Sequence, residues 1–307
     1  MANATVAVGT YAGEAARPYV AAAVLSADTI ANGYVSTIEN VHSKAVLRKF
    51  SGAAITAATC EFTGQGSLTL GEAVLEATAL QVNEQVCNKD LRATWEGMQM
   101  RGQSSNAPAD FTSFAAQYVA AKVAEGIELN LWQGNFDADV SGAATYTSFD
   151  GICQKLKAGY NAGTMQQLAG ATDASNILAR LAGLTAEAPT AIAGDPEAKI
   201  FMSRGSAQLY YQALAATYQL PFLNDGLVAR YAGYDIITPA GMPNDAFILA
   251  KAENLYFGTD LLTDHIQASV LDLTGVTGDD VTRIIMKFSG GTQVVDLASA
   301  GFAYRTS

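Results

Sequence analysis

The residue types that carry most acid–base and metal chemistry are scarce in this chain of 307 residues. Its two histidines are His42 and His265, and its three cysteines, Cys60, Cys87 and Cys153, lie far apart without a CxxC spacing. A nucleophile–histidine pair needs one of these histidines as its base, and neither lies in a catalytic motif. Zinc needs clustered ligands, which this spacing does not supply. The sequence therefore predicts no catalytic residues, no metal site and two solvated or structural histidines.

Glycine-rich and acidic stretches give little support to ligand binding. No GxxxxGK[ST] loop is present, and residues 64–71 neither follow a convincing buried strand nor open a helix, as a dinucleotide fingerprint requires. Asp279 and Asp280 fit either a calcium ligand pair or a solvated β-turn. The turn is favoured because the surrounding GVTGDDVT lacks the alternating oxygen ligands of a calcium loop. No cofactor is predicted.

The densest positive patch consists of Lys44, Arg48 and Lys49, within an acidic chain. Lys and Arg total 18 against 29 Asp and Glu, a formal net charge of −11. This balance opposes a protein that grips phosphates, although it allows non-specific proximity to nucleic acid. The patch either is an ordinary solvated surface or meets acidic residues of another copy.

Composition predicts a globular α+β protein. Half of the residues are apolar and 9% are aromatic, which suffices for a sizeable core, in two lobes or in one elaborated unit. The odd cysteine count argues against a disulfide framework and favours a reducing compartment. The N-terminus lacks the pattern of a signal peptide, and the apolar runs fall short of the ~20 residues that cross a membrane, so no membrane partner is expected.

The first half of the chain predicts elements that a monomer would cover poorly. Residues 1–43 are apolar without a sustained period, apart from a possible short helix at 21–27, and indicate an extended arm on a neighbouring surface or a frayed terminus. Residues 44–72 predict a long two-stranded excursion, and residues 71–97 a strand followed by a short helix. Helical spacing predicts one long helix at about 110–133 with one broad buried face. Its apolar residues are Phe111, Phe114, Tyr118, Ile127 and Leu131, with Val119 and Val123 on an adjoining stripe.

The second half alternates helices and strands before it turns to strands alone. After a loop, FDGICQKLKAG predicts a short segment that packs on the long helix. We expect a helix capped by Asp173 or Ser175 and ending at Gly183, a strand at 198–202, a helix at about 205–219, strands on both sides of Gly233 and one ending at residue 251. Antiparallel strands follow at 266–273, 281–288 and 292–297, with a tight hairpin turn at Gly290 and Gly291.

The order of these elements resembles the Hong Kong 97 fold of tailed-phage major capsid proteins. The resemblance rests on the long helix ending NLWQGN before FDGI, on AKIFMSRGSAQLYYQAL, and on the arc GYDIITPAGMPNDAFILAKAENLYFGTDL, and it spans residues 44–307. It implies an N-terminal arm at 1–43, an extended loop at 44–72, a peripheral domain at 73–150 and 251–307 whose spine helix lies at about 110–133, and an axial domain at 151–250.

The resemblance implies a structural protein and not an enzyme. Its copies would form pentamers and hexamers of an icosahedral head around double-stranded DNA, with portal, scaffolding or decoration proteins as further partners. It would be assembled in the bacterial cytoplasm and located in the virion. The candidates for contacts between subunits are Lys44, Arg48, Lys49, Phe50 and Phe62. Crosslinking between Lys and Asn occurs in some members, but no motif assigns it here.

Three other interpretations stay open. An encapsulin-type shell shares this fold and encloses protein cargo, so particle contents or a neighbouring portal or terminase gene would separate the two. A soluble α+β enzyme predicts a monomer or small oligomer with a polar pocket. A minor capsid or tail-tube protein fits the long helix and the following lobe poorly.

Overall fold

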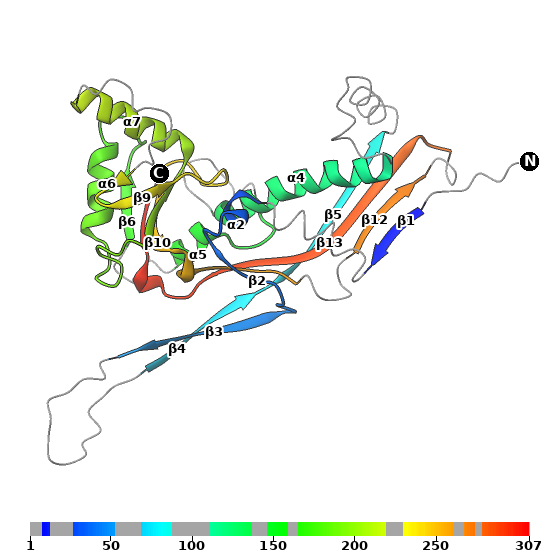
Figure 1. Ribbon diagram of the computed structural model, residues 1–307, viewed down its shortest axis with the longest axis horizontal. Coiled ribbons are helices and arrows are strands. Elements are labelled where there is room, and N and C mark those ends of the chain that lie inside the picture. Colours follow the sequence, from blue (N-terminus) through cyan, green and yellow to red (C-terminus); the bar gives the residue numbers. More distant parts are fainter. Residues whose placement is uncertain are drawn as a thin grey trace, which may run out of the picture.

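The computed structural model is an α+β chain with a lobe of helices and short strands at one end, long strands under a helix at the other, and a projecting hairpin (Figure 1). It describes residues 8–12, 27–52, 69–87, 111–136, 146–158, 165–218, 230–260, 267–273 and 278–306. The predicted fold class is confirmed at the level of α+β. Residues 1–7 of the expected arm and its possible helix at 21–27, except Ala27, lie outside the described residues.

The first sheet is organised around one long strand, β13. In spatial order its strands are β1 (Val8–Ala12), β12 (Gln267–Asp272), β13 (Val281–Val294), β11 (Leu255–Gly258) and β2 (Ser36–Ile38), with β5 (Thr78–Cys87) also paired to β13. All pairs are antiparallel except β11 with β2. The partners of β5 run from Val281↔Cys87 to Gly290↔Thr78, and those of β11 begin at Gly291. One strand thus holds the chain's β5, β11 and β12 together.

The predicted hairpin turn at Gly290 and Gly291 is wrong, because β13 runs through both residues. Neither glycine has a positive φ. A Cβ atom added to Gly291 would lie 2.0 Å from the backbone oxygen of Glu76, so the glycine lets a neighbouring backbone cross close to β13. A close backbone approach and a tight turn both favour glycine, and the sequence does not distinguish them.

The second sheet has the order β6 (Met165–Ala169), β14 (Gly301–Thr306), β10 (Ala246–Lys251), β7 (Ala198–Met202), β9 (Tyr234–Ile237) and β8 (Arg230–Tyr231). The central strand β10 is buried at every position but its last, which agrees with its nearly continuous apolar sequence. The strands predicted at 198–202, around Gly233 and up to residue 251 are confirmed.

Helices α6 (Ile177–Ala186) and α7 (Arg204–Tyr218) pack in the same lobe. The predicted end of α6 at Gly183 is wrong: Leu184 is buried in the core with Ile177 and Leu181, and this burial outweighs the low helix propensity of glycine. Asp173 accepts hydrogen bonds from the backbone N–H groups of Ser175 and Asn176 at 2.9 and 3.0 Å, so it shapes the turn before the helix.

The long helix is confirmed as α4 (Phe111–Gln133). Of the predicted face, Val119, Val123, Ile127 and Leu131 are buried. The side chains of Phe111, Phe114 and Tyr118 lie outside those that the structure describes. The short segment after it is α5 (Ile152–Ala158), which packs on α4 and β13.

A buried carboxylate joins α4 to the short helix α2 (Asp28–Ala31). The Glu128 carboxylate accepts hydrogen bonds from the Thr29 backbone N–H at 3.0 Å, from the Thr29 hydroxyl and from the Trp132 indole N–H at 3.2 Å. Glu128 is 4% exposed, so these neutral donors replace the water that it loses. The short helix α2 is thereby fixed to the long helix α4.

The strands of the predicted peripheral and axial domains can be located in the two sheets. Strands β11, β12 and β13, from the predicted peripheral segment 251–307, lie in the first sheet, and β14 from the same segment lies in the second. Strands β6 to β9 and most of β10 come from segment 151–250 and lie in the second sheet. The domain boundaries themselves stay a prediction.

Candidate interaction surface

A two-stranded hairpin projects away from both sheets (Figure 1). Its strands, β3 (Lys44–Ser51) and β4 (Thr69–Glu76), pair antiparallel over eight positions, from Lys44↔Glu76 to Ser51↔Thr69. Within the described part of the chain β3 pairs with β4 alone, so its outer edge is open. The predicted two-stranded excursion is confirmed for these two strands.

One side of the hairpin, which we call the exposed face, alternates ion pairs and apolar pairs. Its cross-strand pairs are Lys44 with Glu76, Val46 with Val74, Arg48 with Glu72, and Phe50 with Leu70. The four apolar side chains are 41–68% exposed, Phe50 the most. Exposed large apolar side chains that form one contiguous patch mark interaction sites.

The ion pairs of the exposed face set the strands' register but stabilise the chain little. Lys44 Nζ lies 2.5 Å from Glu76 Oε1, and its hydrogen bond lowers the pKa of the Glu76 carboxyl. Arg48 Nε lies 3.7 Å from Glu72 Oε1. All four side chains are more than half exposed, and ion pairs of this kind contribute little to stability because water and salt screen the charges.

The opposite side of the hairpin is fixed to the rest of the molecule. Leu75 is fully buried near the hairpin base, where a Cβ added to Gly258 would lie 2.6 Å from Leu75 Cδ2. Lys49 forms an ion pair with Asp296, whose carboxylate also accepts a hydrogen bond from Ser299. Burial raises the pKa of Asp296, but the hydrogen bonds from Lys49 and Ser299 outweigh it, and the net pKa is below the usual value. The hairpin is thus anchored on one face and bare on the other.

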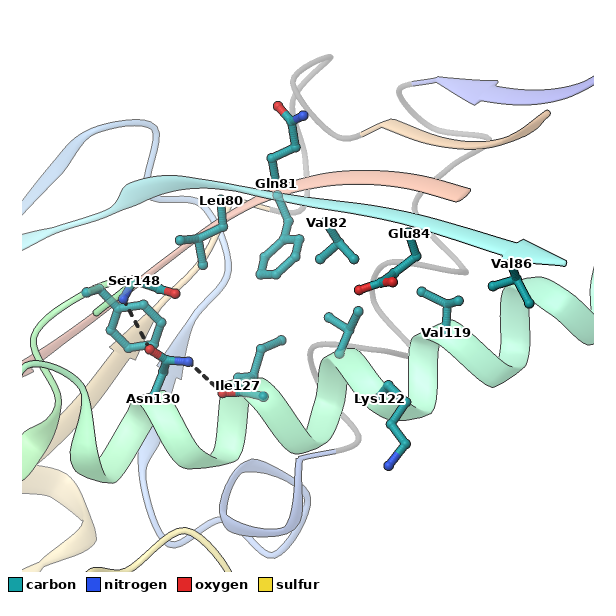
Figure 2. Close-up of a pocket in the computed structure, with 14 residues that line it drawn as sticks. Leu80, Gln81, Val82, Glu84, Val86, Val119, Lys122, Ile127, Asn130 and Ser148 are labelled. Carbon is teal, nitrogen blue, oxygen red and sulfur yellow. Dashed lines mark hydrogen bonds between the residues drawn. The ribbon is translucent and has the colours of Figure 1, made fainter. Parts of the chain in front are cut away.

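A second surface feature is an apolar groove of about 480 Å³ between β5 and α4 (Figure 2). Leu80, Val82 and Val86 point from β5 toward Val119 and Ile127 on α4, whereas Gln81 points away from the helix. Asn130 lies at one end, where it accepts a hydrogen bond from the Ser148 backbone N–H at 3.3 Å and donates one to the Gly126 carbonyl at 2.8 Å. Glu84 and Lys122 are the charged residues of the lining.

Among the described residues, the histidine, cysteine and aspartate side chains considered for chemistry do not gather at either feature. His42 Nδ1 lies 2.9 Å from Asp260 Oδ2, a structural ion-pair geometry, and His265 lies outside the described residues. The Cys153 thiol is fully buried, and burial raises its pKa above the usual range. Asp279 and Asp280 are exposed before β13. Among the described residues no group of three or more His, Cys, Asp or Glu side chains is placed to hold a metal ion.

In the described ranges, none of the helices combines the length and the apolar character needed to cross a membrane.

Four of the five predicted contact residues lie on the hairpin. Lys44, Arg48 and Phe50 belong to the exposed face, whereas Lys49 points the other way, to Asp296; Phe62 lies outside the described residues. Residue-type reasoning missed Val46, Leu70 and Val74. Their signal lies in every second residue of KAVLRKF and of EAVLE opposite it. These residues are charged and apolar in turn, so both kinds lie on one face of the paired strands.

The comparisons with known proteins identify a fold. A scan of protein-family models finds no match, and a search of curated proteins finds none either. Among solved structures, a chain of the satellite phage P4 procapsid, a structure that includes the size determination protein, has a TM-score of 0.62 at 15% identity, with 95% of this chain and 90% of that chain covered.

Two further structures agree with it. The capsid of an empty GTA particle gives a TM-score of 0.56 at 12% identity, with 93% and 90% covered, and the cyanophage A-1(L) capsid gives 0.54 at 11% identity, with 91% and 93% covered. At such low identity the likeness establishes the fold, and it covers nearly the whole chain. The chain has the fold of phage capsid proteins.

Proposed function

We propose that this chain is the major capsid protein of a tailed phage, with the Hong Kong 97 architecture. In this proposal its copies form pentamers and hexamers, which close into an icosahedral head around double-stranded DNA. Residues 1–43 are the arm, 44–72 the extended loop, 73–150 and 251–307 the peripheral domain, and 151–250 the axial domain. The near-complete coverage of procapsid and capsid chains supports this assignment.

The observation that carries the proposal is the exposed face of the hairpin. Phe50 is 68% exposed and Val46 is 52% exposed, on strands that project from the body of the chain. Burying an apolar side chain of this size contributes about 1.5–3 kcal/mol relative to full exposure. A monomer forgoes that stabilisation, whereas a neighbour that covers the face recovers it at every subunit of a closed shell.

The acidic balance of the chain suits a container better than a nucleic-acid binder. With 29 acidic against 18 basic residues, its net charge opposes tight contact with packaged DNA. Confinement by a wall needs no such contact. The proposal therefore places the important contacts between copies of the chain, with DNA enclosed by non-specific proximity, and assigns the chain no catalytic role.

The test is assembly of the purified chain, followed by size-exclusion chromatography with light scattering and by electron microscopy. We expect closed particles built from five-fold and six-fold capsomers, alone or with a co-expressed scaffolding protein. A chain that stays monomeric at high concentration, in every salt and with every scaffold tried, would contradict the shell. Uniform small cages filled with protein in the native cell would instead identify an encapsulin-type compartment.

A further inference from the structure

A cavity of about 370 Å³ lies where the hairpin joins the first sheet. Its polar lining consists of His42, Gln81, Asp260, Lys287 and Ser289. Gln81 points away from α4, and its cross-strand partner on β13 is Lys287 (Figure 2). The cavity therefore draws side chains from the face of the sheet that is turned away from the apolar groove.

The acidic residue of this lining already has a partner. The Asp260 side chain is 4% exposed, and its Oδ2 atom lies 2.9 Å from His42 Nδ1. A buried carboxylate needs such a partner to replace the water that it loses. The pairing also fixes the imidazole, so that its second nitrogen, Nε2, is directed away from Asp260. The negative charge of the lining is thus neutralised within the chain.

The donors of the lining have no such partners. In the described part of the chain, neither Lys287 Nζ nor the Gln81 side-chain amide forms a hydrogen bond or an ion pair. The Ser289 hydroxyl oxygen accepts a hydrogen bond from the Asp260 backbone N–H at 2.9 Å, which leaves its own hydrogen available. An ammonium group has three donors and an amide has two. The cavity therefore has more donors than acceptors.

The unpaired lysine stands out against the charge of the whole chain. Acidic residues number 29 against 18 basic residues, so carboxylates that could pair with a lysine are plentiful. Lys287 is nevertheless exposed beside the cavity without one. A positive charge with free donors at a cavity attracts an anion from outside the chain.

The donor types favour phosphate over carboxylate. Arginine, whose planar fork suits a carboxylate, is absent from this lining, whereas lysine binds phosphate as a point charge. Serine and glutamine side chains are also common phosphate contacts. The donors come from β5 and β13, with His42 at the start of the hairpin, and a tetrahedral group presents oxygens in several directions. The volume also leaves room for a group attached to the phosphate.

We infer that this cavity binds a phosphate group, with Lys287, Gln81 and Ser289 as its donors and His42 held in place by Asp260. The phosphate is either free or part of a larger molecule, such as the backbone of a nucleic acid, and the experiment below separates these sources. All of the binding side chains belong to one chain, so the site goes beyond the proposed shell and does not depend on assembly.

The first test is a titration of the full-length chain with inorganic phosphate, followed by phosphorus NMR at fixed pH and ionic strength. The wild type should show saturable binding. Lys287→Gln should raise the Kd by at least about tenfold, because it removes a charge-assisted hydrogen bond. Circular dichroism of this variant should be unchanged, since Lys287 is exposed.

Arg283→Gln is the matched control for Lys287→Gln. Arg283 is exposed on the same face of β13, four residues away, and lies outside the cavity lining. Its substitution removes the same charge and should change the Kd by less than about twofold. An equal loss of affinity in both variants would indicate a diffuse attraction to the sheet and would overturn the site.

A second pair of variants tests the uncharged donor. Gln81→Ala should raise the Kd about threefold, because one neutral hydrogen bond is lost. Gln85→Ala, on the same face of β5 but outside the lining, is its control and should leave the Kd unchanged. Equal effects of these two substitutions would also contradict the site.

Competition identifies the source of the phosphate. Acetate at the same ionic strength should not displace bound phosphate, and displacement as effective as that by phosphate itself would overturn the preference for phosphate. A thymidine oligonucleotide without terminal phosphates is the second competitor. If it displaces phosphate, the site accepts a nucleic-acid backbone; if it does not, the site is specific for free phosphate and phosphomonoesters.

These measurements separate the site from the shell. A wild-type chain that shows no saturable phosphate binding would remove the site, even if it assembles normally. A chain that binds phosphate through Lys287 but never assembles would remove the shell and leave the site.

Discussion

The second sheet and the hairpin differ in how far their apolar side chains are buried. In β10 the residues from Ala246 to Ala250 are all buried, because strands lie on both sides of it and helices pack in the same lobe. In β3 every second residue faces solvent, including Phe50. One region completes its burial within a single chain, and the other leaves its apolar side chains exposed. Stability and assembly should therefore depend on different residues.

The largest expected effect comes from emptying the completed core. Phe201 is fully buried, with its ring 5.3 Å from Trp132 and 6.2 Å from Tyr34 between centroids. Phe201→Ala should lower the free energy of unfolding by about 3–5 kcal/mol, because it leaves a cavity. Urea denaturation of the unassembled chain measures it. If Phe201→Ala lost no more unfolding free energy than Phe50→Ala, the contrast between the buried core and the exposed face would be contradicted.

The buried carboxylate should come next. Glu128→Ala leaves the Thr29 N–H, the Thr29 hydroxyl and the Trp132 N–H without this acceptor and should cost about 3 kcal/mol. Glu125→Ala, on the same helix but in an exposed pair with Lys122, is the control and should change stability by less than about 0.5 kcal/mol. Thermal unfolding compares them, and equal losses would show that the network contributes nothing.

Substitutions at two glycines compare a position where an added Cβ is crowded with one where it is not. Gly291→Ala should destabilise the chain by about 2 kcal/mol, because its Cβ would meet the Glu76 backbone. Gly126→Ala in α4 adds a Cβ that meets no atom within 4 Å apart from the adjacent residues and the nearby backbone of its own helix, and it should stabilise the chain by up to about 1 kcal/mol. Opposite shifts in the urea midpoint are expected, and shifts of the same sign would contradict the close crossing of β4 and β13.

The hairpin anchor should give a smaller, pH-dependent effect. Lys49→Gln should cost up to about 1 kcal/mol near neutral pH, since the pair is partly exposed. The pKa of Asp296 is lowered in the folded chain, so the stabilisation is present above its ordinary value of 3.8 and is lost as the pH falls through the lowered pKa. Denaturation at pH 7 and below pH 3 should show the difference between the two chains disappear. A constant difference would contradict the ion pair.

The smallest effect on the monomer should accompany a clear effect on assembly. Phe50→Ala removes the most exposed of the four apolar side chains and should change monomer stability by less than about 0.5 kcal/mol. It should still raise the assembly concentration, because the contact loses an apolar anchor. Light scattering tests this, and unimpaired assembly would show that the exposed face stays bare in the shell.

Sequence alone predicted what periodicity and composition determine. The helix at Phe111–Gln133 and the strand at Ala198–Met202 appear where expected, because their apolar residues follow the period of one element. The failures at the Gly290–Gly291 pair and at Gly183 have a different origin. The backbone of Glu76, which is distant in sequence, approaches Gly291, and the burial of Leu184 in the core of the lobe carries the helix past Gly183. At the interaction surface, charge identified Lys44 and Arg48, but Lys49 was assigned without knowledge of its partner Asp296. The groove joins β5 to α4, which only the folded chain brings together.

The pairing of β5 with β13 has a mechanical consequence. Ten consecutive residues pair along two antiparallel strands, and the hairpin continues from one end of β5. A force on the hairpin along the strand direction therefore loads all of these residue pairs in shear at the same time. It does not open the pairs one after another. In the proposed shell, tension on the hairpin would be carried into the middle of the subunit.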